Sequence, residues 1–235
     1  GKLSDAYPFY NLLSPFAYVS DIQICDNMRT YVSWYNAWNK DIGFFILTND
    51  GLEPVRSTND NTTCGSTNKM ALDEHNNVWL ATANDGLVKY DGKFFTYFDM
   101  ENSDIPTNSI ADVKIDDGGN VWGVGGNFLF QYDGHVFHKI IYDSNYTNDY
   151  LLSLDVDGED VYVGSRYQGL LKLNNERLSV IPLEANSIQT NTLTGSGCVD
   201  EKGNFWGGCL EGLITYNLHT KETHIKHYPQ IHETI

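Results

Sequence analysis

The chain lacks the features that mark several large classes of protein. Only 15 of its 235 residues are lysine or arginine, against 31 aspartate or glutamate, and the formal net charge is −16. This balance argues against a nucleic-acid partner, because neutralising phosphates requires lysine and arginine gathered on one face. No apolar run reaches the roughly 18–20 residues of a membrane-spanning helix, so we expect no membrane insertion.

Cysteine is also scarce, and no metal-binding pattern is present. The four cysteines form no C-x-x-C and no pair with zinc-finger spacing, and the seven histidines form no H-E-x-x-H. Cys198 and Cys209 flank one predicted hairpin, so a disulfide is one interpretation and buried free thiols are the other. The glycines at 125–126 precede neither a helix nor a lysine. We therefore predict no metal and no cofactor.

What the chain does contain is a segment of about 44 residues that is written five times. The copies run over 30–55, 77–98, 120–140, 160–181 and 204–228. Each copy has an aromatic residue that follows the previous one at steps of 45, 43, 40 and 44 residues. These aromatic residues are Trp34, Trp79, Trp122, Tyr162 and Trp206. A fixed period of this length is typical of a repeat architecture.

The third copy shows the structure expected of one repeat. Apolar residues alternate over 111–116, and short apolar runs follow at 121–125 and 128–132. Asp133-Gly134 then predicts a two-residue hairpin turn, because glycine adopts positive φ freely, and a fourth run covers 136–140. Each copy is therefore predicted to be a four-stranded antiparallel meander. We expect no substantial helix, because no long segment has a 3.6-residue apolar period.

Five such meanders predict an all-β protein. One four-stranded sheet cannot bury both of its faces alone, whereas sheets stacked radially cover one another. We predict a five-bladed β-propeller of four-stranded antiparallel blades over residues 20–235. Residues 1–19 are an N-terminal segment that adds an outer strand or plugs one face. The alternative is that the five blades are part of a larger ring.

Two sets of repeated residues are expected to have structural roles. The five aromatic residues should pack between blades, because a core needs one per blade whereas a binding site needs few copies. One aspartate per copy lies at the end of the innermost strand, where it should cap the following turn. These aspartates are Asp26, Asp73, Asp116, Asp155 and Asp200.

The repeat resembles that of the two-component-regulator propeller family. The family pattern has an aspartate before a turn, then G-N-[LV]-W on one strand and G-L-x-[RK]-[YF]-D on the next. Asp73, Asn77 and Trp79 fall on this pattern in the second copy. The match is clear over 65–235 and looser over 20–64.

The resemblance implies an exported sensor module. In that family such repeats form the extracytoplasmic region of hybrid histidine kinases, mostly of gut Bacteroidetes, and respond to glycan fragments. We therefore expect a periplasmic or extracellular propeller, its export signal removed, that binds a carbohydrate fragment or a protein partner. The resemblance does not imply a kinase, because the matched residues are structural.

Candidate ligand contacts are the residues that break the repeat. In a meander, loops joining the second and third strands emerge on the same face as loops joining successive blades. Trp38, Lys40 and Asp41 lie in an insertion in the first copy, and Arg166 and Tyr167 replace small residues in the fourth. A ring beside a cation suits a saccharide or a protein, because the ring stacks and the cation donates hydrogen bonds. Further candidates on this face are Tyr146, Tyr150 and Glu211.

The predicted function is non-enzymatic recognition of a ligand in sensing or glycan uptake, with no catalytic residue. A glycoside hydrolase or lyase is the first alternative. It needs an unrepeated pair of carboxylates about 5–9 Å apart, for which Asp41 and Glu211 are the loop acids. A protein–protein interaction scaffold is the second alternative, and a large apolar rim patch without a pocket would favour it.

Overall fold

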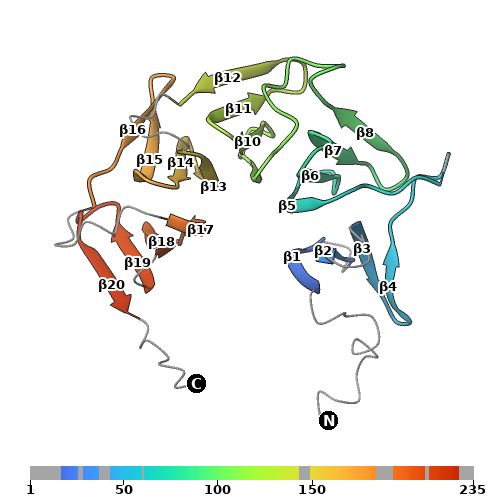
Figure 1. The fold of residues 1–235 in the computed structure, drawn as a ribbon, viewed down its shortest axis with the longest axis horizontal. Helices are drawn as coiled ribbons and strands as arrows, with labels where there is room; N and C mark the ends of the chain where they lie inside the picture. Colours follow the sequence, from blue (N-terminus) through green and yellow to red (C-terminus); the bar gives the residue numbers. More distant parts are fainter. Residues whose placement is uncertain are drawn as a thin grey trace, which may run out of the picture.

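The chain folds into five antiparallel sheets that stand as blades around a common centre (Figure 1). The computed structural model describes residues 17–25, 29–36, 43–59, 61–142, 149–183, 193–209 and 212–227. Within these ranges there are twenty strands and no helix, and each sheet holds four strands that are consecutive in the chain. The predicted all-β, five-bladed β-propeller is confirmed.

We number the blades 1 to 5 in chain order. Blade 1 contains β1 (Ala17–Ile24), β2 (Thr30–Asn36), β3 (Gly43–Thr48) and β4 (Gly51–Pro54). Blade 2 contains β5 (Thr67–Leu72), β6 (Val78–Thr82), β7 (Leu87–Tyr90) and β8 (Phe95–Phe98). Blade 3 contains β9 (Asp112–Ile115), β10 (Val121–Gly125), β11 (Phe128–Tyr132) and β12 (Phe137–Ile141). Blade 4 contains β13 (Leu151–Asp157), β14 (Asp160–Ser165), β15 (Gly169–Asn174) and β16 (Arg177–Val180). Blade 5 contains β17 (Leu193–Val199), β18 (Asn204–Cys209), β19 (Gly212–Asn217) and β20 (Thr223–His227).

The hydrophobic core is divided into clusters that lie between successive blades. In the cluster between blades 2 and 3, Trp79 and Leu87 of one blade pack with Val113, Val121 and Phe130 of the next. Corresponding clusters join blades 1 and 2, 3 and 4, and 4 and 5. Because each cluster takes side chains from two sheets, a single blade has no core of its own.

Three of the predicted anchor aromatics are buried between blades, as expected. Trp79, Trp122 and Tyr162 all lie in these clusters. In blade 1 the side chain of Trp34 lies outside the described residues, so its packing stays a prediction. Tyr31, on the same strand, is buried in the cluster between blades 1 and 2 and stacks on the ring of Phe44.

The prediction that Trp206 is core is wrong. Its side chain is exposed, although its position on β18 matches that of Trp79 on β6. The physical reason is that the anchor of each blade is covered by the blade that follows it. Among the described strands, none packs as a following blade against the outer face of blade 5.

The turn aspartates are confirmed as caps in three blades. Asp73, Asp116 and Asp200 each accept backbone N–H groups from the turn and the N–H of their blade's tryptophan. The Asn204 side chain, the Trp206 indole and backbone N–H groups hold the pKa of Asp200 below its usual range. Asp26 lies outside the described residues.

Asp155 does not cap a turn, so its predicted role is wrong. It pairs with the anchor Tyr162, two residues earlier in the strand than a capping position. Its carboxylate instead accepts the backbone N–H of Val199 in the next blade, at 2.5 Å. Asp21 and Asp112 make the same kind of bond to the innermost strands of blades 2 and 4. These carboxylates clamp neighbouring blades together near the centre of the ring.

Three cysteines in the described part of the chain form no disulfide. The thiols of Cys25 and Cys64 are buried and that of Cys198 is exposed. Burial raises the pKa of Cys64 to about 12. Cys198 lies opposite Trp206 and Cys209 opposite Leu193, so the two do not face each other across the hairpin.

Residues 1–16 lie outside the described residues, and β1 begins at Ala17, so the role of the N-terminal segment stays a prediction. The described residues contain no helix with the length and apolar character needed to cross a membrane.

Candidate ligand-binding surfaces of blade 4

Three of the eight predicted ligand contacts lie in the described part of the chain, and the fold brings them together. Arg166 and Tyr167 follow β14, and Tyr150 immediately precedes β13. The backbone N–H of Arg166 donates to the carbonyl of Tyr150 at 3.0 Å. The other predicted contacts lie outside the described residues: Trp38, Lys40, Asp41, Tyr146 and Glu211.

Arg166 and Tyr167 form a stacked pair. The guanidinium carbon lies 5.1 Å from the centre of the tyrosine ring. Arg166 is exposed and Tyr167 is half-buried, while the Tyr150 side chain is 42% exposed. A stacked guanidinium keeps its N–H donors available in a fixed plane, so the pair can bind hydroxyl or carboxylate oxygens.

A buried aspartate holds this loop in place. Asp149 accepts hydrogen bonds from the Tyr142 hydroxyl at 3.0 Å, the Ser165 hydroxyl at 2.8 Å and the Tyr167 backbone N–H at 3.0 Å. A buried carboxylate with several donors is costly to disrupt, so it fixes the loop that carries Arg166. Asp149 was not identified from the sequence, because nothing local in the sequence shows that it lies against the β14–β15 loop.

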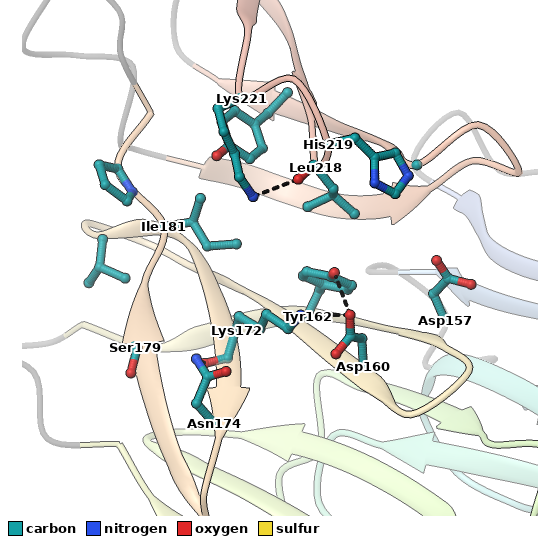
Figure 2. Close-up of a pocket in the computed structure, with 14 residues that line it drawn as sticks. Asp157, Asp160, Tyr162, Lys172, Asn174, Ser179, Ile181, Leu218, His219 and Lys221 are labelled. Atoms are coloured by element: carbon teal, nitrogen blue, oxygen red, sulfur yellow. Dashed lines mark hydrogen bonds and ion pairs between the residues drawn. The ribbon is translucent and has the colours of Figure 1, made fainter.

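A cavity lies at the opposite end of the same blade. It has a volume of about 590 Å³ and lies between blades 4 and 5, beside the β13–β14, β15–β16 and β19–β20 turns (Figure 2). Its apolar wall includes Ile181, Pro182 and Leu218, and its polar wall includes Asp160 and Lys172. A volume of this size is within the usual range of small-molecule sites.

Lys172 and Asp160 form an ion pair in the cavity wall. Lys172 Nζ lies 2.6 Å from Asp160 Oδ2 and 5.3 Å from the centre of the Tyr162 ring, while the Tyr162 hydroxyl donates to Asp160 at 3.0 Å (Figure 2). The hydrogen bond from Lys172 lowers the pKa of Asp160, and the same bond raises the pKa of Lys172. Both groups therefore stay charged at neutral pH, and their oriented side chains can bind a ligand that has hydroxyl groups.

The cavity arises where blade 4 departs from the repeat. At the junction of blades 2 and 3 the corresponding cavity is only about 270 Å³. There Phe98 stacks on Trp79, with ring centres 5.9 Å apart. In blade 4 the matching positions hold Ile181 and Tyr162, which leave more space. The sequence signal was Tyr162 in place of tryptophan, which our sequence analysis treated as core alone.

The described residues contain no group of three or more His, Cys, Asp or Glu side chains that is placed to hold a metal ion. A smaller central cavity of about 220 Å³ is lined by Asp21, Lys69, Asp112 and Lys114 from the innermost strands.

Comparison with known proteins supports the fold. No protein-family model and no curated protein matches the chain. Among solved structures, the extracellular domain of the one-component system BT4673 of B. thetaiotaomicron superposes with a TM-score of 0.70 at 19% identity. The match covers 90% of this chain and 28% of that one.

Two further structures show the same likeness. The extracellular domain of the hybrid two-component system BT3049 of B. thetaiotaomicron matches with a TM-score of 0.66 at 16% identity, over 90% of this chain and 30% of that one. YCF48 bound to D1 peptide matches with a TM-score of 0.61 at 11% identity, over 90% and 67%. The resemblance seen in the repeat is thus confirmed at the level of the fold, and the chain spans less than a third of the Bacteroides domains.

Proposed function

We propose that the chain is a ligand-binding part of an extracytoplasmic sensor, and that it binds a saccharide without converting it. The proposal rests on one observation above all, the rigid Arg166–Tyr167 pair beside Tyr150. These residues depart from the repeat, stand on the face where loops between blades emerge, and combine exposed aromatic surface with fixed N–H donors. The extracellular location of the Bacteroides domains of the same fold supports a periplasmic or extracellular setting.

Saccharides suit this surface for a physical reason. A sugar has one face of C–H groups, which packs on an aromatic ring, and a rim of hydroxyl oxygens, which accept hydrogen bonds from a guanidinium. The net charge of −16 disfavours strongly anionic glycans, so a neutral oligosaccharide is the preferred ligand.

The cavity between blades 4 and 5 is a second place where the same ligand class fits. It offers the Asp160–Lys172 pair next to apolar side chains. Ile181→Phe restores the aromatic residue that fills the matching position in blade 2, so this substitution tests the cavity without removing a polar group.

The test measures the binding of plant and host oligosaccharides by the shift that each causes in the melting temperature. The same samples are then analysed for cleavage products. We expect one class of oligosaccharide to raise the melting temperature without being cleaved. Arg166→Ala and Tyr167→Ala should weaken its binding at least tenfold, since each removes a contact worth about 1.4 kcal/mol or more. Arg177→Ala, an exposed arginine on β16 of the same blade, is the matched control and should bind normally.

Each other outcome has a defined meaning. Loss of binding in Ile181→Phe with normal binding in Tyr167→Ala would move the site to the cavity. Cleaved sugar would overturn the non-enzymatic proposal and direct attention to Asp41 and Glu211. No binding by any sugar would favour a protein partner, as in YCF48, whose structure holds a peptide.

A further inference from the structure

The cavity between blades 4 and 5 lies at the same repeat positions as a smaller cavity between blades 2 and 3. Tyr162 and Gly203 line the first, and the matching residues Trp79 and Gly119 line the second. The two volumes are about 590 and 270 Å³. Because equivalent positions surround both spaces, the tighter junction shows which side chains occupy the space that is open in the looser one.

Between blades 2 and 3 this space is filled by aromatic rings. Phe98 stacks on Trp79 with ring centres 5.9 Å apart. Phe98 also contacts the rings of Tyr132 and Phe137, at 5.1 and 5.8 Å. Phe137 in turn stacks on Tyr132 at 4.6 Å. Four rings therefore pack together at this junction, in the stacked, tilted and edge-on geometries that aromatic pairs favour.

Between blades 4 and 5 two of these rings are absent. Ile181 takes the position of Phe98, and Thr223 takes that of Phe137. The anchor Tyr162 remains, but no aromatic ring of the described residues stacks on it. The hydroxyl oxygen of Thr223 is buried and has no hydrogen-bond partner there. The threonine thus replaces a packed ring without forming a hydrogen bond in return.

A threonine at this position is particular to blade 5. The matching residues of blades 2, 3 and 4 are Phe95, Phe137 and Leu178, each packed with the core cluster of its junction. Isoleucine at the Phe98 position is not particular to blade 4, because blade 3 has Ile140 there. The change that distinguishes the open junction is therefore the loss of a large apolar side chain on blade 5.

The walls of the cavity suit a ring that carries one polar group. Ile181 and Leu218 contribute apolar surface (Figure 2). At the polar end, the bonds that Asp160 accepts from Lys172 and Tyr162 both go to Oδ2. The Asp160 side chain is 46% exposed, so its Oδ1 is accessible. That oxygen can accept a hydrogen bond from a phenol O–H or an indole N–H.

Two lysines on the cavity favour an aromatic ring over a saturated one. Lys172 and Lys221 both line it. Lys172 Nζ lies 5.3 Å from the centre of the Tyr162 ring, and Lys221 Nζ is held by the carbonyl oxygen of Leu218 at 2.5 Å. An ammonium group is attracted to the face of an aromatic ring, whereas a saturated ring of the same size offers it no such attraction.

We propose that the cavity between blades 4 and 5 binds a small aromatic molecule with one hydrogen-bond donor, of the phenol or indole class. Its ring occupies the space that the rings of Phe98 and Phe137 fill in the tighter junction, and its donor binds Asp160. A saccharide fits this cavity less well, because several of its hydroxyl groups would lie against the apolar wall without partners. The inference goes beyond the saccharide proposed for the Arg166–Tyr167 surface and does not rest on it, because the two sites lie at opposite ends of blade 4.

The first experiment titrates the 235-residue chain with phenol and indole, and with cyclohexanol as the saturated counterpart of phenol, by NMR chemical-shift perturbation. We expect saturable binding of phenol and indole, with phenol bound at least tenfold more tightly than cyclohexanol. Equal affinity for phenol and cyclohexanol would overturn the aromatic assignment. Absence of phenol and indole binding, or an oligosaccharide whose binding alone is abolished by Ile181→Phe, would also overturn it.

The second experiment fills the cavity from each side. Ile181→Phe and Thr223→Phe each put back one of the two rings and should weaken indole binding at least tenfold. Thr223→Val removes only the buried hydroxyl, is the matched control and should bind indole as the parent does. Unchanged indole binding in a folded phenylalanine variant would overturn the proposal, and either variant suffices should the other fail to fold. The oligosaccharide panel tests the proposed function separately, so the failure of one proposal is distinguishable from the failure of the other.

Discussion

The junction between blades 2 and 3 and the junction between blades 4 and 5 use the same repeat positions with different side chains. In the first, these positions hold the aromatic residues Trp79, Phe98 and Phe137. The ring centre of Phe98 lies 5.9 Å from that of Trp79 and 5.8 Å from that of Phe137. In the second, the matching residues are Tyr162, Ile181 and Thr223. The second junction has the larger cavity, about 590 against 270 Å³.

The comparison shows how a repeat protein makes a site without changing its backbone. The strand pairing of the two blade pairs is alike, so the scaffold is preserved while smaller side chains open space. The hydroxyl oxygen of Thr223 is buried and, among the buried polar side-chain atoms of the described residues, is the one that lacks a hydrogen-bond partner. The junction of blades 4 and 5 is thus packed less completely than the junction of blades 2 and 3, and such departures from good packing are typical of functional sites.

The largest expected effect comes from removing the anchor of the tighter junction. Trp79→Ala should lower the free energy of unfolding by about 3–5 kcal/mol, the usual loss for a buried large aromatic. Tyr162→Ala should cost less, because its surroundings already contain a cavity. Chemical denaturation of both variants measures the difference, and equal losses would remove the contrast between the junctions.

The next largest effect concerns Asp112 of blade 3, whose carboxylate accepts the backbone N–H of Leu154 in blade 4. Burial raises the pKa of Asp112 to about 6, above the ordinary value of 3.8. A raised pKa in the folded state stabilises the fold at low pH, and this contribution is lost as the pH rises from about 4 through 6. Asp112→Asn keeps an acceptor for Leu154 but removes the charge. It should therefore gain on the order of 2–3 kcal/mol relative to the parent chain between pH 4 and pH 7.

Denaturation at a series of pH values measures this gain. Asp117→Asn, at an exposed turn position, is the control for loss of one negative charge. A stability difference between Asp112→Asn and the parent that does not change with pH would contradict the assignment.

A smaller effect is expected when the tight junction is made like the loose one. Phe98→Ile removes the ring that stacks on Trp79 and makes a tilted contact with the ring of Tyr132. The lost ring contacts and the added space should cost about 1–2 kcal/mol. A crystal structure of the variant should show an enlarged cavity between blades 2 and 3. If the neighbouring side chains instead move in and fill the space, residues other than the one at this position must keep the cavity between blades 4 and 5 open.

The smallest effect is expected from the ion pair in the cavity wall. Lys172→Met removes the contact with Asp160 but keeps the aliphatic stem over Tyr162. Because both charged groups are partly exposed, the loss of stability should be below about 1 kcal/mol at neutral pH, and smaller still in high salt. A larger loss in thermal denaturation would mean that the pair is structural and not available to a ligand.

The repeat in the sequence is sufficient to predict the architecture of this protein. The turn signals and alternating apolar runs predicted four strands per copy, and no end of an observed strand in blade 3 differs from that prediction by more than one residue. Local pattern is sufficient here, because each blade is a meander of neighbouring strands closed by short turns.

Tertiary structure decided the matters that depend on contacts between blades. Sequence spacing selected Trp34 in the first copy, whereas the burial of Tyr31 between blades 1 and 2 was visible only in the folded chain. The exposure of Trp206 and the clamp role of Asp155 follow from which sheet lies next to each residue. Arg166 and Tyr167 were found as departures from the repeat, whereas Asp149, which fixes their loop, and the cavity beside Tyr162 depend on residues far apart in the chain. Period and turn chemistry are local and can be read in sequence, but burial between blades is a property of the assembled ring.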